Sequence, residues 1–134
     1  MSSERTTEAR VYDIGIIGSG PAGLSAAARA AELGVSHVLL ESETHVSNTI
    51  HKYQKGKHVM AEPRILPLRS SIDFGAGTRE EVLDTWSRQA LEKNLDVRHG
   101  CEVVSLTGSD GAFEVATRSG EGFRCRKVIL AIGL

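Results

Sequence analysis

Three glycines near the N-terminus have the spacing of a phosphate-binding turn. Gly18, Gly20 and Gly23 form a GxGxxG pattern that follows an apolar run and opens an alanine-rich segment. In such a turn the first glycine permits a tight bend, the second lets the backbone approach a pyrophosphate, and the third lets the helix pack closely on the strand. The start of the following helix offers free N–H groups and partial positive charge to phosphates. The pattern therefore predicts dinucleotide binding.

A carboxylate occupies the second position that such a site requires. Glu41 ends the run His37–Glu41 and lies 23 residues after Gly18. It can accept hydrogen bonds from both hydroxyls of an adenosine ribose, and it would repel a ribose 2′-phosphate. Taken alone, Glu41 is equally compatible with a solvated acid at a strand end. Its register with the glycines and with Pro21 favours the ribose role.

The elements that must position these residues form a βαβ unit. Residues 11–17 are mostly apolar and β-branched, which is typical of a strand buried in a parallel sheet. Pro21 occupies the first helical position, and residues 22–33 are alanine-rich with Gly34 at the end. Residues 37–41 are the second strand, and we expect a right-handed crossover between the two strands.

The rest of the chain alternates loops, one long helix and short strands. Residues 42–77 show no sustained period and are expected to be long loops with short elements. Thr78 and Glu81 form a capping box for a helix that ends near Asn94. The apolar stripe expected on this helix comprises Val82, Leu83, Trp86, Ala90 and Leu91.

After this helix the pattern changes to strands. Residues 95–98 predict a short parallel strand. An antiparallel β-meander is predicted at residues 102–107, 112–117 and 122–126, followed by a separate buried strand at 127–133. The fold class is therefore α/β, a Rossmann-like parallel sheet with a meander. The expected order of parallel strands is 96–98, 37–41, 12–17 and 127–131, and residues 1–10 are expected to be a flexible tail.

Two segments resemble the FAD-binding motifs of flavoproteins with two dinucleotide-binding domains, the pyridine nucleotide-disulfide oxidoreductases. Gly-Ser-Gly-Pro-Ala-Gly-Leu at 18–24 resembles the N-terminal motif. Residues 128–133 look like the second FAD segment, commonly ending in Ala-Thr-Gly, with Ile132 replacing the threonine. Residues 46–53 and 78–80 are similar to thioredoxin-reductase-like proteins of the bacillithiol-disulfide-reductase kind.

The resemblance implies a set of FAD-binding residues. Glu41 would hold the ribose, Val104 would lie beside the adenine, and Asn48 and Thr49 would approach the ribityl chain and flavin ring. The residues assigned to the pyrophosphate are Gly18, Ser19, Gly20, Pro21, Ala22 and Gly23. Ser42, Ala131 and Gly133 complete the predicted cofactor-binding set, and no catalytic residue is assigned.

The function that the resemblance implies is NAD(P)H-dependent flavoprotein oxidoreduction, in which hydride passes from nicotinamide to flavin and on to an unidentified acceptor. NAD(P)H would bind a domain beyond Leu134. Residues 11–134 are expected to be the N-terminal portion of a truncated FAD-binding domain, inactive alone. A flavin monooxygenase-type enzyme and a non-catalytic dinucleotide-binding or sensing module are the alternatives.

Composition excludes several other classes. Sixteen basic and seventeen acidic residues give a net charge of −1, so we expect neither nucleic acid nor membrane as a partner. Residues 42–77 lack cysteine, so the CxxxxC disulfide of glutathione-reductase-like enzymes is absent. Cys101 and Cys125 are expected to be small buried hydrophobes, and the five histidines lack metal-ligand spacing. We expect a cytoplasmic protein, with a homodimer left open.

Overall fold

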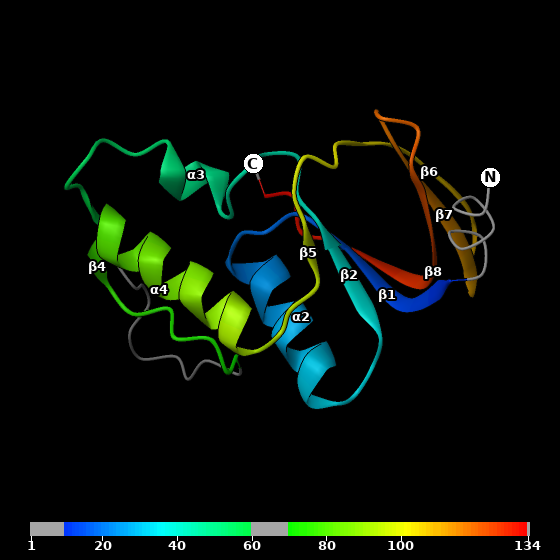
Figure 1. The fold of residues 1–134 in the computed structure, drawn as a ribbon, viewed down its shortest axis with the longest axis horizontal. Helices are drawn as coiled ribbons and strands as arrows, with labels where there is room; N and C mark the ends of the chain where they lie inside the picture. Colours follow the sequence, from blue (N-terminus) through cyan, green and yellow to red (C-terminus); the bar gives the residue numbers. More distant parts are fainter. Residues whose placement is uncertain (1–9, 60–69, 134) are drawn as a thin grey trace.

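The computed structural model describes residues 10–59 and 70–133. Figure 1 shows a sheet at one end of the molecule, helix α2 beside it, and helix α4 extending to the other end. The helices are α2 (Pro21–Glu32), α3 (Asn48–His51) and α4 (Arg79–Glu92). The strands are β1 (Val11–Ile17), β2 (His37–Leu40), β3 (His58–Val59), β4 (Gly77–Thr78), β5 (Val97–Arg98), β6 (Val103–Ser109), β7 (Ala112–Thr117) and β8 (Gly122–Leu130).

The main sheet has six strands in the order β5-β2-β1-β8-β7-β6. Strands β5, β2, β1 and β8 are parallel neighbours, and β8, β7 and β6 are antiparallel neighbours. This arrangement confirms the expected α/β class and the predicted order of the parallel strands. A parallel sheet collects the carboxyl ends of its strands at one edge, and these ends position the candidate site.

Strand β8 corrects one sequence prediction. Residues 122–126 and 127–133 were expected to be two strands, but a single strand runs from Gly122 to Leu130. Its first part pairs with β7, and it pairs with β1 from Arg124 to Leu130. Because no glycine or proline interrupts the chain between these two parts, one strand serves both the meander and the parallel sheet.

The end of β8 also differs from the buried strand that was expected. Ile129 is 38% exposed and Leu130 is 61% exposed. Ile129 is the register partner of Ile16, which is fully buried under the helices. The apolar sequence at the end of β8 therefore predicts a covered strand, whereas the described elements cover β1 and leave this end of β8 open.

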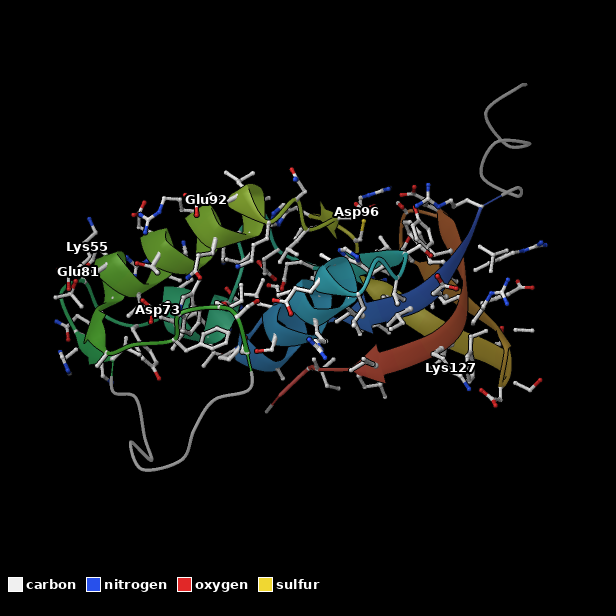
Figure 2. The ribbon with its side chains drawn as sticks, turned by 90° about the horizontal axis from the view of Figure 1, so that it is seen from below. Lys55, Asp73, Glu81, Glu92, Asp96 and Lys127 are labelled. Atoms are coloured by element: carbon white, nitrogen blue, oxygen red, sulfur yellow. The ribbon has the colours of Figure 1, made fainter. Side chains whose placement is uncertain are left out.

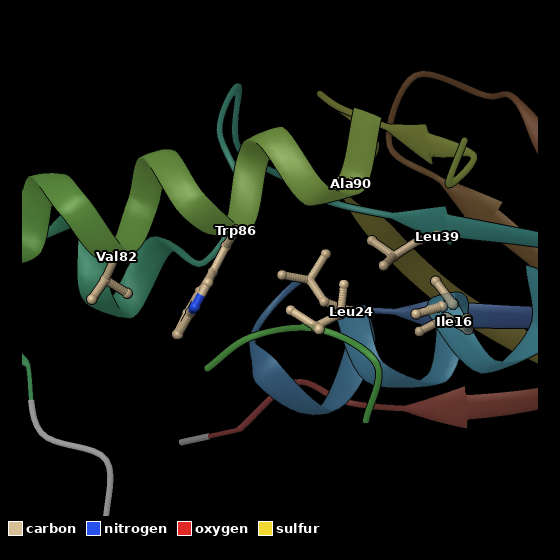
Figure 3. Packing of buried hydrophobic residues seen from close by; sticks show 9 residues of the cluster. Ile16, Leu24, Leu39, Val82, Trp86 and Ala90 are labelled. Carbon is tan, nitrogen blue, oxygen red and sulfur yellow. The ribbon is translucent and has the colours of Figure 1, made fainter. Parts of the chain in front are cut away.

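Helices α2 and α4 pack on the sheet face that carries Ile16 and Leu39. Trp86 is 4% exposed and packs edge-on against Phe74, with ring centroids 5.1 Å apart. Figure 3 shows Val82, Trp86 and Ala90 of α4 pointing toward the side on which Leu24 of α2 lies. Trp86 is thus a core residue, as predicted, and the α4 stripe has a spacing of four residues. Leu91 does not belong to it, since this side chain is 79% exposed.

The opposite face of the sheet carries a second cluster, formed by side chains of β1, β2, β7 and β8. This second cluster of buried side chains includes Tyr12, Val38, Leu40, Val115, Phe123 and Cys125. Because alternate residues of a strand point to opposite faces, Leu39 joins the first cluster while Val38 and Leu40 join the second. Strand β2 is buried along its whole length, and its carboxyl end therefore has a fixed position.

The helix termini agree with the sequence signals. Pro21 begins α2, and Gly34 follows its end with a φ of 69°. Thr78 caps α4: its hydroxyl accepts from the Glu81 N–H at 3.2 Å, and the Glu81 carboxylate accepts from the Thr78 N–H at 2.9 Å. The predicted capping box is therefore confirmed.

Residues 42–59 and 70–78 contain only short elements, as expected. They include the one-turn helix α3 and the two-stranded antiparallel pair of β3 and β4. Lys55 lies at the outer end of the molecule near the start of α4 (Figure 2). The predicted tail at residues 1–10 lies outside the described residues except for Arg10. None of the helices within residues 10–59 and 70–133 has the length and apolarity to span a membrane.

Candidate functional site

The glycine-rich turn connects β1 to α2 at the carboxyl edge of the sheet. Gly18 has a φ of 108°, and a Cβ at this position would overlap the carbonyl group of Ala131. A Cβ on Gly23 would overlap the carbonyl oxygen of Gly18. Both glycines are therefore required by the fold itself, because the backbone approaches them too closely for any side chain.

Gly20 differs from the other two glycines. It is the N-cap of α2 with an extended conformation, a φ of −73°, and a Cβ there would have no neighbour within 4 Å. None of the described side chains caps the N-terminus of α2 by a hydrogen bond, and Pro21 and Ala22 are exposed. The turn thus presents bare backbone and the positive end of a 12-residue helix to open space.

Glu41 lies directly beside this turn. Its N–H donates to the Arg98 carbonyl at 2.9 Å and its carbonyl accepts from the Cys101 N–H at 2.8 Å, which fixes the backbone next to β5. The residue is only 7% exposed. A buried carboxylate requires hydrogen-bond donors, and Glu41 has them on both oxygens.

The Glu41 donors come from two directions. The Ser19 hydroxyl donates to Oε1. The Glu43 N–H donates to Oε2 at 3.0 Å, and the Ser42 hydroxyl lies 3.4 Å from the same oxygen. A carboxylate has about four acceptor positions, so these three donors leave Glu41 capacity for one further hydroxyl donor. Ser42, predicted as a cofactor-binding residue, is exposed at the edge of this group.

The segment with Asn48 and Thr49 follows on the same side of the glycine turn. Asn48 is half-buried and its Oδ1 lies 2.7 Å from Nε2 of His45, while Thr49 is exposed. The rings of His45 and His51 are stacked with centroids 3.5 Å apart. The pKa of His51 is lowered below its usual range. Partial burial is the main cause, and the nearby His45 and Arg79 add to it.

Helix α4 holds this segment in place. The Arg79 guanidinium donates to the His51 carbonyl from Nε at 3.1 Å and from Nη2 at 2.8 Å. The Arg79 N–H donates to the Lys57 carbonyl at 2.7 Å. The four basic residues Lys52, Lys55, Lys57 and His58 are all exposed, which agrees with a solvated loop.

The second predicted FAD segment reaches the glycine turn. The Ala131 N–H donates to the Ile17 carbonyl at 2.8 Å, and Ala131 is the residue that closely approaches Gly18. Gly133 follows with a φ of 65° and is exposed. The structure therefore brings Ala131 together with Gly18, although 113 residues separate them in the sequence.

Val104 is the predicted residue that lies outside this group. It is 50% exposed on β6, which is the last strand of the sheet and is separated from β1 by β8 and β7. The pairing of β6 with β7 shifts between Val103 and Ser105, so Val104 is the extra residue of a bulge and its backbone leaves the ladder. The Cys101 N–H is hydrogen-bonded to the Glu41 carbonyl, and Val104 is three residues further along the chain. Val104 therefore lies within about 11 Å of Cys101.

Thiol and metal chemistry find no support among the described residues. Both cysteines are free and buried, as predicted, and burial raises the pKa of the Cys101 and Cys125 thiols. A high pKa keeps a thiol protonated and unreactive. Within residues 10–59 and 70–133 no group of three or more acidic, histidine or cysteine side chains could hold a metal ion.

Sequence reasoning missed the role of Ser47. Its N–H donates to the Ser19 hydroxyl at 2.9 Å, and its own hydroxyl donates to the Ser19 carbonyl at 2.8 Å. Ser47 is 3% exposed and has a left-handed backbone with a φ of 54°. A serine is not a typical residue for that conformation, so no local signal in the sequence indicates this contact.

Comparison with known proteins decides the family. Residues 15–134 match the family described as pyridine nucleotide-disulphide oxidoreductase. The chain belongs to this family. Relatives of this oxidoreductase chain include a ferredoxin–NADP reductase of Leuconostoc citreum, 28% identical over 92% of the chain and 34% of the relative. A thioredoxin reductase of Claviceps purpurea is 28% identical over 92% of the chain and 35% of the relative.

Solved structures agree with the fold of this family member. The bacillithiol disulfide reductase of Staphylococcus aureus superimposes with a TM-score of 0.78 at 23% identity, covering 92% of this chain and 39% of that one. A flavin-containing monooxygenase of Stenotrophomonas maltophilia gives a TM-score of 0.74 at 24% identity, covering 90% and 38%. The chain thus spans little more than a third of the length of these proteins.

Proposed function

We propose that residues 11–134 are the N-terminal portion of an FAD-binding domain in an NAD(P)H-dependent flavoprotein oxidoreductase. The observation that carries the proposal is the pairing of two complementary groups on one edge of the sheet. The uncapped N-terminus of α2 with the bare backbone of Gly20 offers partial positive charge, and Glu41 offers a free acceptor position next to it. This pair suits a diphosphate joined to a ribose.

The residues present fit such a ligand. In the proposal, the turn Gly18–Gly23 holds the pyrophosphate through the backbone N–H groups of its residues other than Pro21, and Glu41 accepts from the ribose. The unpaired backbone of Val104 receives the adenine, and Asn48, Thr49, Ala131 and Gly133 approach the flavin end. When bound, FAD supplies the hydride acceptor between nicotinamide and the final acceptor. The chain itself supplies binding and orientation.

The relatives support the oxidoreductase class of the proposal. Their names include ferredoxin–NADP reductases, a thioredoxin reductase and a dihydrolipoyl dehydrogenase. We extend this class to the present protein. In the proposal, NAD(P)H binds outside residues 1–134, and the protein acts in the cytoplasm. The acceptor is left unassigned, because neither described cysteine has the exposure of a redox thiol.

An absorbance spectrum of the purified protein tests the proposal. Flavin bands at about 375 and 450 nm, released with the cofactor on denaturation, are the expected result. A second measurement is the oxidation of NADH or NADPH by the flavin-containing protein, which we expect to observe. A colourless protein that takes up NAD but not FAD would overturn the flavin assignment and favour a nicotinamide-binding module. Oxygen-dependent consumption with an added organic substrate would favour the monooxygenase alternative.

A further inference from the structure

Ser19 stands in the middle of the glycine-rich turn, yet its side chain faces inward. The residue is 2% exposed, whereas Pro21 and Ala22 after it are exposed. Its hydroxyl is engaged on both sides, by the Ser47 N–H at 2.9 Å and by the Glu41 carboxylate. The hydroxyl therefore has no free donor for a phosphate at the surface of the turn.

The direction of these hydrogen bonds follows from the groups involved. A backbone N–H can only donate, so the Ser19 oxygen must accept from Ser47. The single hydroxyl proton of Ser19 then points to Oε1 of the Glu41 carboxylate, which accepts it. The result is a chain of two hydrogen bonds that runs from the Ser47 N–H through the Ser19 hydroxyl to Oε1 of Glu41. The second bond is charge-assisted and is therefore the stronger kind.

The contacts with Ser19 also fix the conformation of Ser47. Its left-handed backbone is unusual for a residue with a side chain, and such a conformation persists where surrounding contacts impose it. Here the imposing contacts are the two bonds to Ser19, one from the N–H and one from the hydroxyl. The left-handed turn aims the Ser47 N–H at Ser19, 28 residues earlier in the chain.

We propose that Ser19 and Ser47 are positioning residues that orient the Glu41 carboxylate for the adenosine ribose. The proposal rests on the FAD-binding function proposed above and deepens it. Oε1 is set by the serine pair and Oε2 by the Glu43 N–H and the Ser42 hydroxyl, so the remaining acceptor position of the carboxylate points in a fixed direction. A carboxylate fixed before the ligand arrives loses less conformational freedom on binding. The Ser19 hydroxyl thus acts through Glu41 and does not itself bind the phosphate.

A double-mutant cycle tests the proposal by titrating the flavin-free protein with FAD in a calorimeter. Ser19→Ala should weaken FAD binding about tenfold, the effect of a lost charge-assisted hydrogen bond. In the Glu41→Ala background the same substitution should change the affinity less than about twofold, because the residue through which it acts is gone. The control is Ser25→Ala, at another position of α2. It removes a hydroxyl that lies 3.0 Å from the Ser70 hydroxyl, and it should leave FAD affinity unchanged.

Ser47→Gly provides a second variant that keeps the left-handed backbone and the N–H while deleting the hydroxyl. It should weaken FAD about threefold in the wild-type background and leave affinity unchanged in Glu41→Ala. Circular dichroism melting identifies any variant that does not fold, and Ser47→Gly alone then decides the question. Additive effects of the serine and Glu41 substitutions, as expected of a direct phosphate contact, would overturn the positioning role alone. A wild-type protein that takes up no FAD would overturn the proposed function and this role together.

Discussion

The two sides of the candidate site are held by different kinds of contact. On one side, Gly18, Ser19 and Glu41 stand at the ends of β1 and β2: backbone hydrogen bonds to the sheet fix Gly18 and Glu41, and the side chains of Ser19 and Glu41 are buried. On the other side, the segment around α3 is one turn long and half-exposed, and it depends on the Arg79 side chain and on the stacked rings of His45 and His51. The first side is therefore held by the sheet itself, whereas the second side, called the attached side below, is held mainly by side-chain contacts.

Substitutions on the sheet-held side should affect folding, whereas those on the attached side should affect mainly binding. Changes within the sheet-held side should be large, because the core has no room to adjust. Changes at the attached side should be smaller and sensitive to conditions, because partly exposed ionisable groups carry the contacts. Gly20 is the exception within the first side, since its Cβ position faces open space.

The largest effect is expected for Gly23→Ala. The new Cβ would overlap the Gly18 carbonyl oxygen, so the start of α2 must move away from β1. We expect the free energy of unfolding to fall by about 3 kcal/mol, measured by urea denaturation. Gly20→Ala is the matched control and should change it by less than about 0.5 kcal/mol. Equal destabilisation by both substitutions would show that the two glycines do not differ in the way described.

Gly20→Val should separate binding from folding. The side chain has space in the protein, so the melting temperature should stay near that of the wild type. It would occupy the place where the proposed pyrophosphate approaches the backbone, and flavin occupancy should be almost abolished. The absorbance ratio of flavin to protein after purification measures this. Full occupancy in this variant would contradict the pyrophosphate assignment.

Glu41→Ala should weaken FAD binding by about 1.5–3 kcal/mol, the range for hydrogen bonds to a charged group. The control is Glu43→Ala, which makes the same change in net charge two residues away. Glu43 contributes its N–H, not its side chain, to the Glu41 carboxylate, so its substitution should leave FAD affinity unchanged. Calorimetric titration compares the two variants, and equal effects would indicate a general charge effect instead of a ribose contact.

The smallest effect concerns pH and the attached side. The pKa of His51 is lowered in the folded protein by partial burial and then by His45 and Arg79. The unfolded chain therefore binds more protons below the ordinary histidine pKa of about 6.5, and stability should fall as the pH drops through that region. Melting temperatures recorded between about pH 5 and 8 should decline less for His51→Gln than for the wild type. His99→Gln, at an exposed position, is the control and should retain the wild-type slope.

Local patterns predicted most of the framework. The GxGxxG spacing, Pro21 and the pair of Thr78 and Glu81 act over a few residues, so the turn and both helix starts follow from neighbouring residues alone. The order of the parallel strands also agreed with the prediction. Cys125 and Trp86 are buried, as predicted, because each lies at an inward-facing position of its strand or helix.

Contacts between distant segments could not be predicted in this way. The separate strand expected at 127–133 proved to be the second part of β8, because pairing with β1 favours continuation where no local signal marks a break. The inward orientation of Ser19 depends on Ser47, and the stacking of His45 on His51 depends on a turn that serine adopts only under tertiary constraint.

By itself, the sequence determined the βαβ unit, the glycine turn and the presence of an acid after the second strand, because these depend on local sterics and hydrophobic spacing. The burial of the Glu41 carboxylate, its orientation by Ser19 and Ser47, and the contact of Ala131 with Gly18 depend on long-range packing. The physical reason is that these contacts join segments 22 to 113 residues apart, and a hydrogen bond over such a separation forms only after the core has brought its partners together.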